Sequence, residues 1–262
     1  MSLTSLTSAG CRACASAQDL GFDFTMALQP IVNVTTKQVI AQEALVRGLE
    51  QQTAAEVLGK VTDENRYRFD QVCRVKAVEL AAKLGVGSML SINFMPNAVY
   101  QPERCLRTTL EAAAACQFPV ERIVFEITES ERIENTNHLR SIVTHYRTRG
   151  FRTAIDDFGA GYSGLNLLAE LQTDFIKLDM ALIRMIDRDR TRQAIVRGIV
   201  SVCRDLGIAP IAEGIETVEE LHALEDLGLE LFQGFLFARP AFEAQAEVTF
   251  PSDHAPKGRR LG

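Results

Sequence analysis

The chain has 262 residues, of which 47% are hydrophobic and 24% are charged, and its formal net charge is −6. This composition is ordinary for a globular protein, and the length suits one barrel-sized domain. The acidic balance argues against a partner that is a nucleic-acid polymer, because proteins that bind one usually carry a basic face. No apolar run reaches the roughly 18 residues of a membrane helix, so no membrane span is expected.

The two ends of the chain read differently from its middle. Small and polar residues fill positions 1–20, which we expect to form a flexible leader. We expect a folded domain over 21–250 and a flexible tail over 251–262. The start shows no secretory pattern, and the cysteines look like free thiols, so a cytoplasmic protein is expected. Cys11 and Cys14 form a lone CxxC, interpreted as an exposed pair, with zinc or redox use as the alternative.

Strand-like and helix-like segments alternate between the two ends. The strand candidates are 24–32, 38–46, 88–94, 122–128, 152–158, 175–179, 209–215 and 231–237. The helix candidates, with apolar residues at three- and four-residue steps, are 70–84, 104–116, 137–150, 191–207 and 217–228. Eight strands with intervening helices predict an α/β fold, a (β/α)₈ TIM-like barrel.

The first two strands break the alternation. Only residues 33–37 separate them, whereas parallel neighbours need a dozen or more connecting residues. The first strand is therefore predicted to run antiparallel to the second.

Acids and amides follow the strands of the predicted barrel, at the end where barrel enzymes hold their active sites. In chain order they are Glu43, Asn93, Glu126 with Glu129, Asp156 with Asp157, Lys177 with Asp179, Glu213 with Glu216, and Gln233. A single acid at a strand end is more often a helix cap or a surface ion pair, but a series on consecutive strands is hard to explain that way. Clustered carboxylates repel one another unless cations bind them.

Oxygen ligands of this kind favour the hard cations Mg²⁺ or Mn²⁺. The adjacent Asp156 and Asp157 can serve two ions, with one carboxylate bridging them. Two ions about 3.5–4 Å apart are the usual arrangement for in-line attack on a phosphodiester. The sequence thus predicts a metal-dependent phosphodiesterase.

Lys177 has two interpretations. A lysine whose pKa is lowered by burial forms Schiff bases, which would indicate a barrel lyase or aldolase. Among so many carboxylates the pKa is instead expected to stay high, and the ammonium would steer a nucleophilic water or stabilise phosphoryl charge. The second interpretation is favoured because the first leaves the carboxylates unexplained.

These motifs resemble the EAL-domain cyclic di-GMP phosphodiesterases over roughly residues 22–245. The name motif stands as Glu43-Ala44-Leu45, extended to EALVR. The other blocks are QPIV (29–32), INF (92–94), FEITES (125–130), DDFGAGYS (156–163), FIKLD (175–179), AEGIET (212–217) and QGFLFARP (233–240). The tripeptide alone is common, but all the blocks in this order are highly specific. Ala160 is a departure, since threonine is commoner there, and Asn93 is followed by Phe-Met-Pro rather than the more usual Leu-Ser.

The resemblance implies a role for each site residue. The implied metal ligands are Glu43, Asn93, Glu126, Asp156 and Asp157. Lys177 would orient the attacking water, Glu213 would be a further ligand or the base, and Glu129 would brace the DDFGAGYS loop. The implied substrate contacts are Gln29, Leu45, Arg47, Glu216 and Gln233.

The resemblance also implies the reaction, which is hydrolysis of cyclic di-GMP to linear pGpG with two Mg²⁺ or Mn²⁺ ions per site. This reaction lowers the level of a bacterial second messenger. The alternative is a catalytically silent cyclic di-GMP receptor of the same fold, but such receptors typically lack a metal acid or the lysine. A homodimer is expected through the helix that begins near Ser163, unless Leu165, Leu167 and Leu168 simply pack on the barrel.

Overall fold

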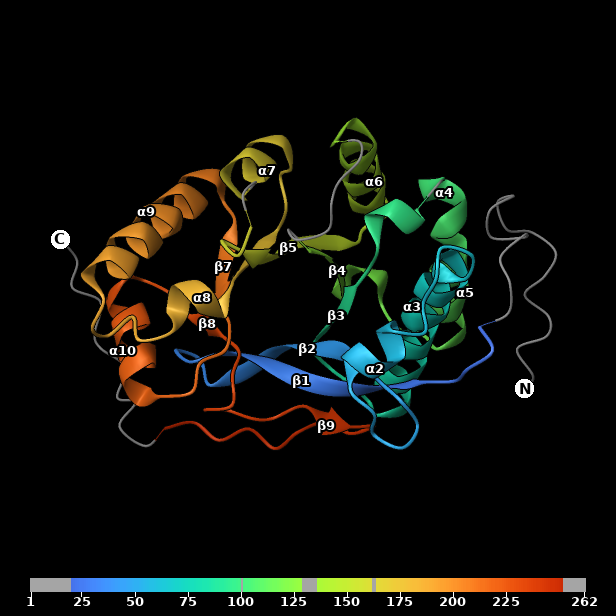
Figure 1. The fold of residues 1–262 in the computed structure, drawn as a ribbon, viewed down its shortest axis with the longest axis horizontal. Coiled ribbons are helices and arrows are strands. Elements are labelled where there is room, and N and C mark those ends of the chain that lie inside the picture. Colours follow the sequence, from blue (N-terminus) through green and yellow to red (C-terminus); the bar gives the residue numbers. More distant parts are fainter. Residues whose placement is uncertain (1–19, 100, 129–135, 162–163, 252–262) are drawn as a thin grey trace.

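The computed structural model describes residues 20–99, 101–128, 136–161 and 164–251 (Figure 1). Eight strands close into a barrel in the order β1 to β8, with β8 returning to β1. Their bounds are β1 Thr25–Asn33, β2 Gln38–Arg47, β3 Met89–Asn93, β4 Ile123–Thr128, β5 Arg152–Phe158, β6 Phe175–Leu178, β7 Ala209–Ala212 and β8 Leu231–Phe232. A short strand outside the barrel, β9 Ala241–Phe242, pairs with β1. The predicted TIM-like barrel is confirmed.

The first strand is antiparallel to all its partners. It pairs antiparallel with β2, β8 and β9, whereas β2 through β8 pair parallel with one another. A tight turn makes this possible, since Asn33 Oδ1 accepts the Thr36 amide at 2.8 Å and Lys37 takes a left-handed φ of 55°. The prediction from the short connection is therefore also confirmed.

Helices surround the barrel, with α3 to α6 on one side of Figure 1 and α7 to α10 on the other. Their bounds are α2 Ala54–Leu58, α3 Arg66–Lys83, α4 Pro102–Cys105, α5 Arg107–Ala115, α6 Thr136–Thr148, α7 Gly164–Glu170, α8 Met180–Ile183, α9 Arg190–Leu206 and α10 Val218–Asp226. Two short 3₁₀ turns, η2 Pro96–Ala98 and η3 Val120–Arg122, precede α4 and β4.

Several elements differ from the sequence predictions. The helix expected at 104–116 divides into α4 and α5 around Leu106. The strand expected at 231–237 ends at Phe232, because the chain then turns and the Leu236 amide bonds to the Ile215 carbonyl at 3.0 Å. The short α2 and α8 were not predicted, since four or five residues carry too little periodicity to be recognised.

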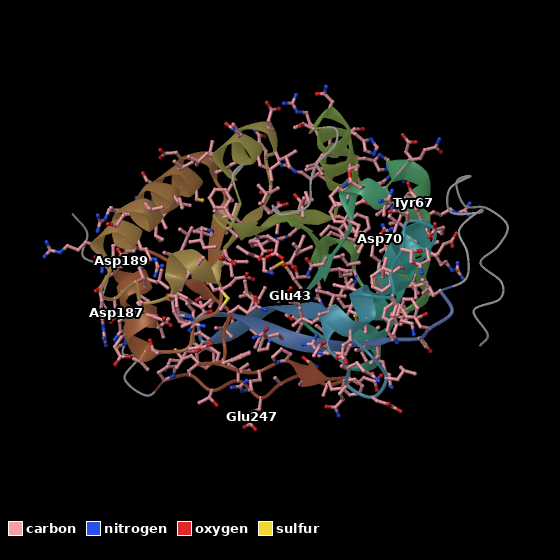
Figure 2. The ribbon with its side chains drawn as sticks, viewed as in Figure 1. Glu43, Tyr67, Asp70, Asp187, Asp189 and Glu247 are labelled. Atoms are coloured by element: carbon pink, nitrogen blue, oxygen red, sulfur yellow. The ribbon has the colours of Figure 1, made fainter. Side chains whose placement is uncertain are left out.

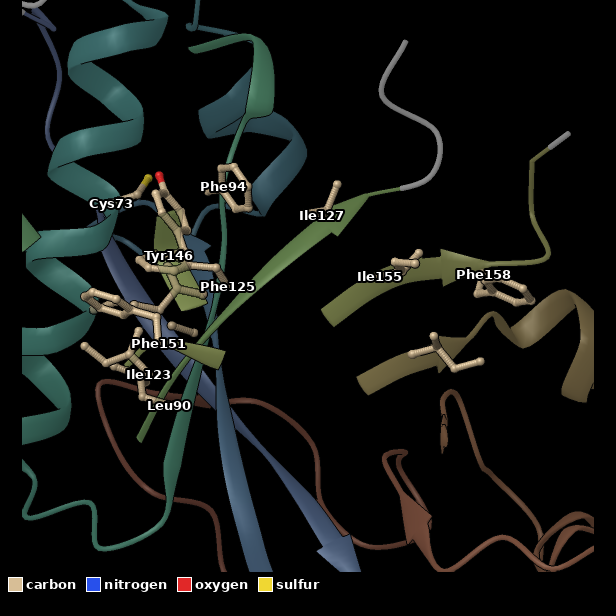
Figure 3. Close-up of a cluster of buried hydrophobic side chains, with 14 of the residues drawn as sticks. Cys73, Leu90, Phe94, Ile123, Phe125, Ile127, Tyr146, Phe151, Ile155 and Phe158 are labelled. Carbon is tan, nitrogen blue, oxygen red and sulfur yellow. The ribbon is translucent and has the colours of Figure 1, made fainter. Parts of the chain in front are cut away.

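The core has two layers that follow from the alternation of strand side chains. Outward-facing residues pack against the helices. For example, the ring centroid of Phe125 lies 4.8 Å from that of Tyr146 and 5.2 Å from that of Phe151 (Figure 3). A second apolar cluster consists of inward-facing strand residues, namely Ile31, Ala41, Val124, Ala154, Phe175 and Ile211. This cluster forms an apolar floor beneath the polar end of the barrel.

The predicted leader and tail, including Cys11 and Cys14, lie outside the described residues, apart from Leu20 and Pro251 at their edges. Within the described ranges, no helix combines the length and apolar character needed to cross a membrane.

Candidate active site

Lys177 lies at the centre of the polar end of the barrel, where Figure 2 labels Glu43. Its side chain is 1% exposed, and its Nζ is within reach of carboxylates from four other strands or strand ends. The distances are 3.3 Å to Glu43 Oε1, 3.0 Å to Glu126 Oε2, 3.0 Å to Asp156 Oδ1 and 2.7 Å to Glu213 Oε1. The structure thus brings together the acids that the sequence placed on successive strands.

This surrounding charge decides the protonation of the lysine. Burial favours the neutral amine, but Asp156, Glu126, Glu213 and Glu43 together outweigh it and hold the pKa of Lys177 well above its ordinary value. An amine that stays protonated is a poor Schiff-base nucleophile. The electrostatics therefore favour a cationic role for this lysine over the lyase or aldolase alternative.

The carboxylates around Lys177 respond differently to the same burial. Burial raises the pKa of Glu126 well above its usual range and that of Glu213 to about 8, although the Lys177 ammonium opposes both shifts. Burial acts the same way on Glu43, but there the ammonium and the Gln233 hydrogen bond outweigh it, and the pKa lies below its ordinary value. Glu43 is thus held ionised, while Glu126 and Glu213 take up protons more readily.

Two amides fix the Glu43 carboxylate from both sides. Asn93 Nδ2 donates to Glu43 Oε1 at 3.0 Å, and Gln233 Nε2 donates to Glu43 Oε2 at 2.7 Å. Deeper in the barrel, Ser91 Oγ donates to Glu126 Oε1 at 2.5 Å. These bonds set the direction of both carboxylates before anything binds.

Asp156 and Asp157 reach the same cavity although they are consecutive on one strand. In a regular strand their side chains would point to opposite faces. Here the β5–β6 register shifts between Ile155 and Phe158, and Asp157 takes a left-handed φ of 54°, which is costly for a residue other than glycine. Burial, followed by the charges of Asp156 and Asp179, raises the pKa of Asp157 to about 6.

The carboxylates fall into two groups whose oxygens lie within 4.8 Å of one another and could each hold a metal ion. One group is Glu43, Glu126 and Asp156, and the other is Asp156, Asp157 and Glu213. Asp156 belongs to both groups. Its buried Oδ1 accepts no directed hydrogen bond from any described residue, although Lys177 Nζ lies 3.0 Å away. An all-oxygen donor set with a shared carboxylate fits a pair of hard divalent cations.

A cavity of about 330 Å³ opens over this centre. Eight of the predicted site residues line it, namely Gln29, Glu43, Asp156, Asp157, Lys177, Glu213, Glu216 and Gln233. Leu45 and Asn93 instead line a second, mostly apolar cavity of about 450 Å³ between the barrel and α2 and α3. The Arg47 guanidinium donates to the Val46 carbonyl at 2.7 Å and does not line the first cavity. Glu129 lies outside the described residues.

Sequence reasoning missed two apolar residues at the mouth of the first cavity, Met180 and Phe235. Phe235 is 46% exposed, and the Arg239 guanidinium lies 4.1 Å from its ring centroid. An aromatic residue two positions after Gln233 was a signal that could have identified it. Gly234, between Gln233 and Phe235, packs so closely that a Cβ there would lie 2.1 Å from the Ile215 carbonyl oxygen.

The fold and the site define a barrel protein with a lysine-centred acidic site at the C-terminal ends of its strands. The chain belongs to the EAL domain family, whose family model matches residues 15–240.

Relatives and solved structures extend this assignment. The chain is 33% identical over 240 residues to the Escherichia coli K12 blue light- and temperature-regulated antirepressor BluF, covering 91% of this chain and 59% of BluF. It is 42% identical over 115 residues to the E. coli K12 cyclic di-GMP phosphodiesterase PdeR, covering 44% of this chain and 17% of PdeR. A standalone EAL protein from Vibrio cholerae O395, solved with cyclic di-GMP bound, has a TM-score of 0.86 and 57% identity over 88% of this chain and 98% of that one. The chain therefore spans less than two thirds of both sequence relatives.

Proposed function

We propose that this chain is a metal-dependent phosphodiesterase that hydrolyses cyclic di-GMP to linear pGpG and so lowers the level of a bacterial second messenger. The observation that carries the proposal is the pair of carboxylate groups that share Asp156 around the cationic Lys177. The name of PdeR and the cyclic di-GMP in the V. cholerae structure support the choice of substrate.

Glu43, Asn93, Glu126, Asp156 and Asp157 would hold two Mg²⁺ or Mn²⁺ ions. Bound ions of this kind supply Lewis-acid stabilisation of phosphoryl charge and lower the pKa of a bound water. Lys177, fixed by four carboxylates, would orient the attacking water, and Glu213 would accept its proton or act as a further ligand. Glu129 would brace the loop that follows β5.

The substrate would be held by Gln29, Leu45, Arg47, Glu216 and Gln233. The fork of donors on Arg47 suits bidentate binding of a phosphate. In this structure that side chain bonds to the Val46 carbonyl, so engaging a phosphate would require it to exchange this bond.

Product analysis tests this function. Purified protein should convert cyclic di-GMP to pGpG, as resolved by liquid chromatography with mass detection. The second candidate is a receptor that binds cyclic di-GMP without hydrolysing it, and the name of its relative BluF, an antirepressor, supports this candidate. Saturable binding with no product under any divalent cation would establish the receptor and overturn the enzyme.

We also propose a homodimer through α7. The structure buries Leu167 and Leu168 against the barrel but leaves Leu165 64% exposed on this helix. Packing on the barrel thus accounts for two of the three leucines and leaves the third as the candidate contact. In a two-fold dimer this patch would meet its own copy.

Leu165→Glu is expected to convert the dimer to a folded monomer, because a like-charge pair would then lie at the two-fold contact. Light scattering measures the mass, and the turnover assay reports whether assembly affects the site through the loop between β5 and α7. Leu206→Glu is the matched control. Leu206 is 52% exposed, but it is the last residue of α9 and lies at the end of the barrel away from the start of α7. A wild-type chain that is monomeric and fully active at micromolar concentration contradicts this proposal.

A further inference from the structure

A buried carboxylate on α10 joins two loops at the mouth of the active-site cavity. Glu220 is 3% exposed, and its Oε1 accepts the Met185 amide at 3.1 Å. Its Oε2 accepts the amides of Glu216 at 3.2 Å and Thr217 at 3.3 Å. Within the described ranges Glu220 forms no ion pair within 4 Å, and three N–H groups donate to its buried carboxylate. The charge of the Arg184 guanidinium also acts on it.

Part of this arrangement is an ordinary helix cap. Thr217 is the N-cap of α10, and Glu220 is the third helical residue, which reaches back to the N-cap amide. The chain contains the same capping box at Thr53 and Glu56 of α2. Glu56 is exposed, and among the described residues its side chain accepts hydrogen bonds from Thr53 alone. A cap by itself therefore does not require the additional bond to Met185.

The additional bond crosses between loops that both line the cavity. Met185 follows α8 in the loop that begins at Asp179, and Met180 from this loop lines the cavity. Glu216 belongs to the loop after β7 and also lines the cavity. Met185 takes a left-handed φ of 56°, a strained conformation for a side chain of its size, and the bond to Glu220 holds it there.

The two ends of the loop after β7 are anchored separately. The Glu213 amide bonds to the Leu178 carbonyl at 3.2 Å, and the Ile215 amide bonds to the Gln233 carbonyl at 3.1 Å. The Glu216 amide depends on Glu220 instead. The Glu216 side chain pairs with Arg184 at 2.7 Å, beside the strained Met185. A change at Glu220 should therefore loosen Glu216 and leave Glu213 in place beside Lys177.

We propose that Glu220 is a positioning residue that locks the loop after β6 to the loop after β7 and so sets the affinity for substrate. This inference rests on the proposed function and deepens it, because Glu216 is one of its substrate contacts. A carboxylate is needed because both of its oxygens accept hydrogen bonds, whereas a glutamine would place an N–H donor against one set of amides.

Glu220→Gln is the test, with Glu56→Gln as the matched control for loss of a capping-box carboxylate. Breaking one set of bonds to a charged group is expected to raise the KM for cyclic di-GMP about tenfold, with kcat changed less than about twofold. Glu56→Gln should change neither value. Hydrogen exchange across residues 180–189 should be faster in Glu220→Gln than in wild type and unchanged in Glu56→Gln.

Two results would overturn the role of Glu220. One is a Glu220→Gln protein with unaltered KM and exchange, which would leave this residue as a cap alone. The other is a fall in kcat at constant KM. The exchange measurement also separates this inference from the proposed function, since it reads the loops even if no cyclic di-GMP is turned over. If the variant does not fold, hydrogen exchange at the wild-type Met185 amide tests the bond to Glu220. This amide should be protected from exchange although Met185 is 60% exposed.

Discussion

Lys177→Ala is expected to lower kcat for cyclic di-GMP by about two to four orders of magnitude, while substrate binding is retained. Lys177 is 1% exposed and contacts four carboxylates, so no other cation among the described residues can take its position beside the attacking water. The loss should fall on kcat, because the ammonium would act on charge that develops in the transition state. Steady-state kinetics at saturating metal, with binding measured by calorimetry, check both parts.

Stability must be controlled in this experiment. Removing one partner of a buried ion pair costs about 3–5 kcal/mol, so the variant should melt at a lower temperature without divalent cations and recover with them. Lys76→Ala is the comparison variant, because it removes an ion pair on the outside of the barrel. In that pair Lys76 Nζ lies 2.8 Å from Asp23 Oδ1. A Lys177→Ala enzyme with normal kcat and only a raised KM would refute the assigned role.

Asp156→Asn is expected to abolish binding at both metal positions, whereas Glu126→Gln and Asp157→Asn should each weaken one. The reason is that Asp156 belongs to both carboxylate groups, while Glu126 and Asp157 each belong to a single group. Activity should fall with the number of ions lost, so Asp156→Asn should show the largest decrease. Titration with Mn²⁺, followed by calorimetry or electron paramagnetic resonance, gives the number of ions per chain.

The wild type should bind two ions in this titration. An Asp156→Asn protein that still binds two would show that Asp156 does not bridge them. Asp174→Asn is a suitable control, because Asp174 bonds to the Thr153 amide at 2.8 Å and belongs to neither group.

The barrel and the position of the site could be predicted because they follow from local patterns. Strand and helix periodicities are encoded within each segment, and the five-residue connection 33–37 by itself determines the direction of β1. Once the strands are parallel, their carboxyl ends meet at one rim, so Glu43, Glu126 and Glu213 are brought together by topology alone.

The rest depends on contacts between distant segments that no local pattern records. The shift in β5 that turns Asp157 toward the cavity depends on pairing with β6. The bond between Glu220 in α10 and the Met185 amide joins residues 35 positions apart. The placement of Leu45 in a separate cavity reflects how α2 and α3 pack on the barrel. Side-chain direction and loop-to-loop bonding therefore required the structure, although the residue types at the site did not.

The decisive measurement is turnover of cyclic di-GMP by the purified chain, before and after exhaustive chelation. We expect conversion to pGpG with Mg²⁺ or Mn²⁺, loss of conversion after chelation, and recovery when either ion is restored. We also expect inhibition by Ca²⁺, which tolerates more ligands and looser geometry than Mg²⁺. Full activity in the chelated protein would contradict the two-metal account.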